Sequence, residues 1–126
     1  MSNSEGGIEV TAEVVYLAER SSPEQGYYFF GYRIRIRNLG PAPARLISRH
    51  WIISDAAGHV QEVRGDGVVG EQPRLEPGQE FIYSSFCPLP TPLGSMRGSY
   101  RMRRDEGEEF EAEIPVFTLA TPHSLN

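Results

Sequence analysis

Residues 28–37 read Tyr-Phe-Phe-Gly-Tyr-Arg-Ile-Arg-Ile-Arg, and this stretch decides the fold class. Apolar side chains occupy its even positions, and arginines occupy positions 33, 35 and 37. Alternation with a period of two is typical of a β-strand that has one face in the core and the other in solvent. We therefore predict a strand whose arginines form a ladder on the outer face of a sheet. The alternative is a site for an anion or a partner.

The same alternation extends along most of the chain, in short segments that glycine- and proline-containing turns separate. The further predicted strands cover residues 8–16, 44–54, 58–64, 79–87, 99–103, 109–114 and 116–119. No segment has the pattern of an amphipathic helix. Many short strands with such turns favour an all-β fold. We predict an antiparallel β-sandwich of seven or eight strands, of the fibronectin type III or immunoglobulin-like kind.

The register of the C-terminal hairpin follows from matching its apolar faces. Met102 is placed opposite Phe110, so residues 105–107 (Asp-Glu-Gly) form the loop and Gly107 takes a left-handed conformation. The same register predicts two cross-strand ion pairs, Arg103–Glu109 and Arg101–Glu111.

The predicted strand at residues 44–54 has an ambiguous pattern, because Leu46 and Ile52 share one face whereas Trp51 and Ile53 share the other. We assign Trp51 to the core. This assignment places Arg49 on the same inward face, which requires a bulge, a partner carboxylate or exposure at an edge.

The length of 126 residues predicts one domain over residues 7–126, preceded by a disordered tail at residues 1–6. The net charge is −5 and all 12 basic residues are arginine, so we expect no nucleic acid partner. A single cysteine, Cys87, excludes an internal disulfide and suits a cytoplasmic location. We also expect no signal peptide and no membrane insertion, because no apolar run is long enough.

Residues 65–70, Gly-Asp-Gly-Val-Val-Gly, have the G-x-G-x-x-G spacing of a dinucleotide-binding loop. That chemistry needs a following helix, whose N-terminus holds the phosphates. Residues 71–78 contain two prolines and a glycine, which disfavour a helix, and Asp66 adds a carboxylate. We predict a structural loop; the alternative is a small-ligand site for a nucleotide, a phosphate or a divalent cation. In that alternative the phosphate would contact Gly65, Gly67 and Gly70.

The polar residues offer no assembled catalytic or metal site, so we predict neither an enzyme nor a cofactor. His50 is expected to be a structural strand residue rather than a metal ligand. Asp55, His59 and Asp66 would form a weak site for a hard cation only if their turns met at one end of the sandwich. The candidate nucleophiles share one strand without a neighbouring base; they are Ser84, Ser85 and Cys87.

Three large apolar side chains lie in or just after the proline-rich segment at residues 88–94. They either pack under the loop or remain exposed as an interaction patch. Together with three residues of the glycine loop they are the candidate interaction residues: Leu89, Leu93, Met96, Asp66, Val68 and Val69.

Several blocks, in order, resemble the ApaG family over nearly the whole chain. They cover residues 48–53 (Ser-Arg-His-Trp-Ile-Ile), 62–73, 75–78 (Leu-Glu-Pro-Gly), 81–85, 91–100 and 114–117. The resemblance implies a fibronectin type III-like sandwich and supplies no catalytic residues. It also implies a binding module, since similar eukaryotic domains are appended to F-box and polymerase-interacting proteins. Bacterial members are associated with cobalt resistance and magnesium efflux.

Residues 75–81 also resemble the L-x-P-G-x-x-Y turn of fibronectin type III domains. Phe81 replaces the tyrosine, so the side-chain hydrogen bond of a tyrosine corner cannot form. Together these features predict a non-catalytic module that binds an unidentified protein partner through one end or face of the sandwich.

Overall fold

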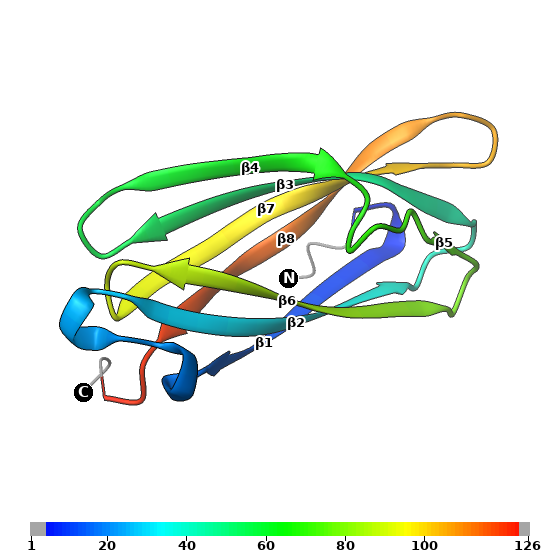
Figure 1. Ribbon diagram of the computed structural model, residues 1–126. Coiled ribbons are helices and arrows are strands. Elements are labelled where there is room, and N and C mark those ends of the chain that lie inside the picture. Colours follow the sequence, from blue (N-terminus) through cyan, green and yellow to red (C-terminus); the bar gives the residue numbers. More distant parts are fainter. Residues whose placement is uncertain (1–4, 124–126) are drawn as a thin grey trace.

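Within residues 5–123, which the computed structural model describes, eight antiparallel strands form two packed sheets (Figure 1). The strands are β1 (Ile8–Tyr16), β2 (Tyr28–Asn38), β3 (Ala44–Asp55), β4 (Val60–Asp66), β5 (Arg74–Leu75), β6 (Glu80–Leu89), β7 (Leu93–Arg103) and β8 (Glu109–Ala120). The helical segments in this range are three-residue 3₁₀ turns: η1 (Glu5–Gly7), η2 (Ala18–Arg20) and η3 (Pro23–Gln25). None of them has the length and hydropathy needed to cross a membrane. The predicted antiparallel β-sandwich is confirmed.

Most of the predicted N-terminal tail, residues 1–4, lies outside the described residues. Gly6 belongs to η1, and its carbonyl accepts a hydrogen bond of 2.9 Å from Arg104. The extent of the domain, residues 7–126, stays a prediction.

The two sheets are the two layers of Figure 1. One has the strand order β1-β2-β6; the other has the order β4-β3-β7-β8, with β5 paired to the start of β3. Because β1 contacts β8 along one side of the sandwich, β6 and β4 are the edge strands of the opposite side. The core fills the space between the layers, and its largest fully buried side chains include Tyr100, Phe30, Ile8, Ile34, Ile36 and Leu46.

The alternation in β2 has the predicted result. Its even-numbered residues from Phe30 to Ile36 are buried, and its arginines lie on the outer face. Each arginine pairs with a glutamate of a neighbouring strand: Arg33 with Glu13, Arg35 with Glu80 and Arg37 with Glu9, at 3.5, 2.7 and 3.3 Å. The arginine ladder is therefore an ion-paired outer face.

A bulge explains the ambiguous pattern of β3. The register with β7 shifts between Leu46 and Ser48, so Ile47 is an extra residue and the residues after it change face. Leu46 before the bulge and Trp51 after it are therefore both buried. The sequence left three alternatives for an inward-facing Arg49, and the bulge is the one present here. The guanidinium of Arg49 bonds to backbone carbonyls and not to a carboxylate.

The C-terminal hairpin has the predicted register. Met102 pairs with Phe110, and Gly107 has a φ of 103° in a three-residue loop. The two predicted ion pairs are present, Arg103–Glu109 at 2.9 Å and Arg101–Glu111 at 3.4 Å, and Arg101 also pairs with Glu109 at 3.2 Å.

Two predicted strand boundaries are wrong in the C-terminal half. β6 runs to Leu89 and β7 begins at Leu93, so most of the expected proline-rich loop is strand. Pro88 is tolerated because β6 is an edge strand. The last two predicted strands are one strand, β8, since Pro115 lies at a bulge where the register with β7 shifts.

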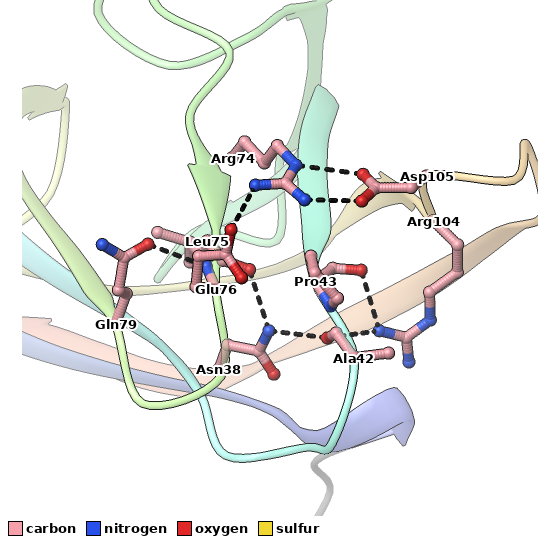
Figure 2. A network of polar contacts seen from close by, with 9 residues as sticks. All are labelled: Asn38, Ala42, Pro43, Arg74, Leu75, Glu76, Gln79, Arg104 and Asp105. Carbon is pink, nitrogen blue, oxygen red and sulfur yellow. Dashed lines mark hydrogen bonds and ion pairs between the residues drawn. The ribbon is translucent and has the colours of Figure 1, made fainter.

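A polar network closes the end of the sandwich where β2 ends and β3 begins (Figure 2). The fully buried Asn38 donates to the carbonyls of Ala42 and Leu75 at 2.9 and 3.0 Å. From the β7–β8 hairpin, Arg104 donates to the carbonyls of Ala42 and Pro43, and its guanidinium lies 4.5 Å above the ring of Phe110. Beside them Arg74 bridges two carboxylates, those of Glu76 and Asp105. We call this set the closed-end network.

Candidate functional site

In the glycine loop, residues 65–70 at the end of β4, and in Glu71 beside it, three N–H groups already donate to backbone carbonyls. The N–H of Gly67 donates to the Ile47 carbonyl at 2.8 Å, and Val68 and Glu71 exchange backbone hydrogen bonds of 2.8 and 2.9 Å. The segment that follows leads into the short strand β5, with no helix. A phosphate would therefore find neither a helix N-terminus nor these N–H groups free.

Close contacts explain two of the three glycines, Gly65 through Arg49 and Gly67 through Glu71. Nη1 of Arg49 donates to the carbonyls of Asp66 and Gly67 at 3.0 and 2.9 Å, and the guanidinium lies across Gly65. A Cβ on Gly65 would lie 2.7 Å from Nη2 of Arg49. A Cβ on Gly67, which has a φ of 63°, would lie 2.3 Å from the Glu71 carbonyl oxygen. The glycine spacing thus serves close packing.

Val69 in the same loop is strained. Its φ is 43°, a left-handed value that a β-branched side chain rarely adopts. Because the neighbouring backbone is fixed by Arg49 and by the Val68–Glu71 pair, the side chain of Val69 is held exposed at the rim of a cleft.

This lateral cleft, of about 290 Å³, opens between the edge strands β4 and β6. Its walls come from both sheets and from the glycine loop, and include Tyr32, Arg49, Trp51, Val69, Tyr83 and Phe86. Trp51 is the only tryptophan of the chain, and its ring contacts those of Tyr32, Tyr100 and Phe117. The lining of the cleft is therefore mostly apolar, with both aromatic and aliphatic side chains and one arginine.

The hydroxyl and thiol groups of this region are neutral at physiological pH. The hydroxyls of Tyr83 and Tyr100 lie 2.5 Å apart, and burial raises the pKa of both above the ordinary tyrosine value. Burial also raises the pKa of Tyr32, and that of the Cys87 thiol to about 11. A thiol with such a pKa is a poor nucleophile, which agrees with the prediction that Cys87 packs in the strand.

The apolar candidates of the proline-rich segment lie mostly in the core. Leu89 and Met96 are only 4% and 1% exposed, and Leu93 is half-buried. Val68 is fully buried as well. Leu89 and Met96 are therefore core residues and do not contribute to an exposed patch. Of the six candidate interaction residues, Asp66 and Val69 are exposed.

The candidate cation ligands do not converge. Asp55 and His59 lie in the β3–β4 turn, where the carboxylate accepts hydrogen bonds from the N–H groups of Ala57 and His59. Asp66 lies at the other end of β4. His50 contacts Glu62 at 2.7 Å, and this hydrogen bond, aided by Arg64, lowers the pKa of Glu62. Residues 5–123 contain no group of three or more potential metal ligands.

A second hollow, of about 610 Å³, lies on the outer face of the three-stranded sheet. Its lining includes Arg33 of the predicted ladder and the candidate nucleophiles Ser84 and Ser85, but its apolar residues were not among the sequence candidates. Val15, Gly31 and Phe86 are directly paired across β1, β2 and β6. Because Gly31 has no side chain, the row leaves a depression between Val15 and Phe86, which are 55% and 53% exposed. Leu17 completes the apolar lining. We call this the outer groove.

The sequence did carry a signal for the outer groove. Val15 and Phe86 are apolar residues out of phase with the buried positions of their strands, and Gly31 interrupts a strand. A glycine inside a strand often marks the close approach of a ligand or another backbone.

Comparison with known proteins gives consistent results. Residues 18–104 match the family described as ApaG domain. Protein ApaG of Anaeromyxobacter dehalogenans is 58% identical over 120 residues, which cover 95% of this chain and 94% of that protein. Protein ApaG of Chromobacterium violaceum is 58% identical over 119 residues, with 94% of each chain covered. A crystal structure of a Bordetella pertussis protein solved under the name ApaA has a TM-score of 0.90 and 51% identity, covering 93% of this chain and 95% of that one.

Proposed function

The chain belongs to the ApaG family, and from this premise we propose that it is a non-catalytic module that binds another protein through the outer groove. The observation that carries the proposal is the row Val15–Gly31–Phe86, an apolar depression on a sheet face where the arginines of β2 are ion-paired. Exposed contiguous apolar surface on a folded domain typically marks a contact site.

The aromatic wall of the groove is already fixed in place. Phe86 stacks on Phe29, with ring centroids 5.3 Å apart, and Phe29 stacks on Tyr27 at 6.0 Å. Arg20 covers both phenylalanines, 4.5 Å from the ring of Phe29 and 5.2 Å from that of Phe86. A preorganised surface loses little conformational entropy on binding, which favours affinity.

The groove fits a polypeptide that inserts an apolar side chain over Gly31. Arg20 at its margin favours a carboxylate next to that side chain, because Arg20 has no carboxylate within 4.0 Å among residues 5–123. We extend the proposal to the family's association with cobalt resistance and magnesium efflux. In this view a cytoplasmic protein partner, rather than chemistry in the domain, links it to those processes.

Site-specific photocrosslinking in cells tests the proposal. A photoreactive residue at Ser84, which lines the groove, should give a discrete adduct with one protein. The same residue at Glu111, on the outer face of the other sheet, is the matched control and should not give it. Val15→Asp should abolish the Ser84 adduct without unfolding the domain. Identical adducts from both positions, or an adduct that survives Val15→Asp, would exclude the outer groove as the binding surface.

A further inference from the structure

We propose that the lateral cleft between β4 and β6 binds a small aromatic carboxylate, with the ring against Trp51 and the carboxylate on the guanidinium of Arg49. The cleft shares part of its lining, including Phe86, with the outer groove, but Arg49 and Trp51 do not line the groove, so the inference does not depend on the proposed protein partner.

The charge of Arg49 is the first argument. Among residues 5–123, no carboxylate lies within 4.0 Å of its guanidinium, although most other arginines of the sheet faces are ion-paired. Nη1 donates to two loop carbonyls, so the N–H groups of Nε and Nη2 have no hydrogen-bond acceptor within this part of the chain. They are not buried without a partner, which means that they are open to solvent or a ligand.

The fixed position of the guanidinium is the second argument. Two carbonyls and the flat surface of Gly65 hold it in one orientation. A planar guanidinium with one edge anchored and another edge free can bind a carboxylate in a bidentate manner. The tyrosine hydroxyls around it are neutral, because burial raises their pKa, so they leave its charge uncompensated.

The size and lining of the cleft select the rest of the ligand. At about 290 Å³ it lies at the lower end of the range for ligand pockets, which suits a single ring and not a nucleotide. Trp51, Tyr32 and Tyr83 line the inner part of the cleft and are 3%, 7% and 7% exposed, so only a small part of each ring is open to a ligand. Aromatic rings stack or pack edge-to-face on one another. Val69 and Phe86 form an apolar rim at the entrance.

Fluorescence of Trp51 reports directly on the cleft, because it is the only tryptophan. We expect phenylacetate to change the emission with a saturable dependence on concentration. Phenylacetamide, which has the ring without the charge, and acetate, which has the charge without the ring, should bind about tenfold more weakly or not at all. The absence of saturation by phenylacetate up to tens of millimolar, or an equal response to phenylacetamide, would overturn the proposal.

Variants of Arg49 and Gly65 separate the ligand contact from the fold. Arg49→Met should abolish the response, whereas Arg45→Met is the matched control. Arg45 lies on the same strand and also donates to a carbonyl, that of Gln72, but lies outside the cleft. If Arg49→Met unfolds, Gly65→Ala serves instead, because the new methyl group displaces the end of the Arg49 side chain without backbone strain. A wild-type response in a folded Arg49 or Gly65 variant would refute the assignment.

The same carboxylate can be free or can end a polypeptide. N-acetyl-Gly-Phe with a free carboxylate and its C-terminal amide distinguish these sources. Tighter binding of the acid peptide than of phenylacetate assigns the cleft to a chain terminus; weaker binding assigns it to a free small molecule. Either order supports the aromatic carboxylate as the ligand, and a response equal for the acid and amide peptides contradicts it.

Discussion

The closed-end network and the outer groove lie at different places on the same sandwich and have opposite characters. In the network, the side-chain amide of Asn38 donates to the carbonyls of Ala42 and Leu75 (Figure 2). Its oxygen accepts a hydrogen bond from the N–H of Gly40. In the groove, Val15 and Phe86 leave apolar surface in water that a side chain on Gly31 would partly cover. The closed-end network stabilises the domain. The outer groove leaves apolar surface exposed to water, which does not stabilise the domain and therefore needs another explanation.

The largest expected effect is that of Asn38→Ala. Removing the side chain leaves the Ala42 and Leu75 carbonyls and the Gly40 N–H without this partner in a buried region, which costs about 3 kcal/mol of unfolding free energy. Urea denaturation measures the change. Ser84→Ala in the groove is the control and should leave stability unchanged. A loss for Asn38→Ala as small as that of the control would remove the difference between the two regions.

Arg104→Met should have the next largest effect and lower the free energy of unfolding by about 2 kcal/mol. The guanidinium joins Gly6, Ala42 and Pro43 through their carbonyls and covers the ring of Phe110. Because these partners are uncharged, the loss should be the same at low and high salt. Arg103→Met removes an exposed ion pair with Glu109 and should give a smaller, salt-dependent loss. Thermal unfolding at two salt concentrations compares them, and a strong salt dependence for Arg104→Met would contradict the assignment.

Gly31→Ala tests whether filling the outer groove prevents binding without destabilising the domain. The new Cβ would lie 3.3 Å from Cγ1 of Val15 and 3.5 Å from Cδ1 of Leu17, so the neighbours shift by a few tenths of an ångström. The lower chain entropy of alanine in the unfolded state offsets this crowding, and stability should change by no more than about 0.5 kcal/mol. Crosslinking from Ser84 should nevertheless fall sharply, since the depression is filled. Unchanged crosslinking in the folded variant would show that the partner does not enter the groove.

The smallest effect concerns pH. Hydrogen bonds from Arg74 lower the pKa of Asp105, so its contribution to stability is present above the unfolded-state pKa of about 4 and is lost as the pH falls through the lower folded-state pKa. Asp105→Asn should therefore flatten the acid limb of a stability–pH profile and leave the groove untouched. Glu106→Gln in the same loop is the control. If both variants have the same acid limb as the unmodified protein, the Arg74–Asp105 pair does not contribute to the pH dependence of stability.

Local sequence patterns predicted most of the strands, but not which residues of distant strands are paired. Alternation placed β1 and β2 correctly, and face matching gave the Met102–Phe110 pair of the hairpin. The sequence did not locate the bulge at Ile47, and it did not predict that one strand continues through Pro115. Both features depend on how a neighbouring strand is paired. The candidate patch around Leu89 and Met96 was likewise settled by burial against the opposite sheet.

By itself, the sequence determined the all-β class, the outward arginines of β2 and the non-helical course of the segment after the glycine loop. These properties follow from neighbours within a few residues, through side-chain alternation and the limits that proline places on the backbone. Only the tertiary structure aligned Val15 with Gly31 and Phe86, and laid Arg49 across Gly65 at the mouth of the lateral cleft. The physical reason is that pairing between distant strands depends on packing of the whole core, and a shift of one residue would turn each of these side chains to the other face.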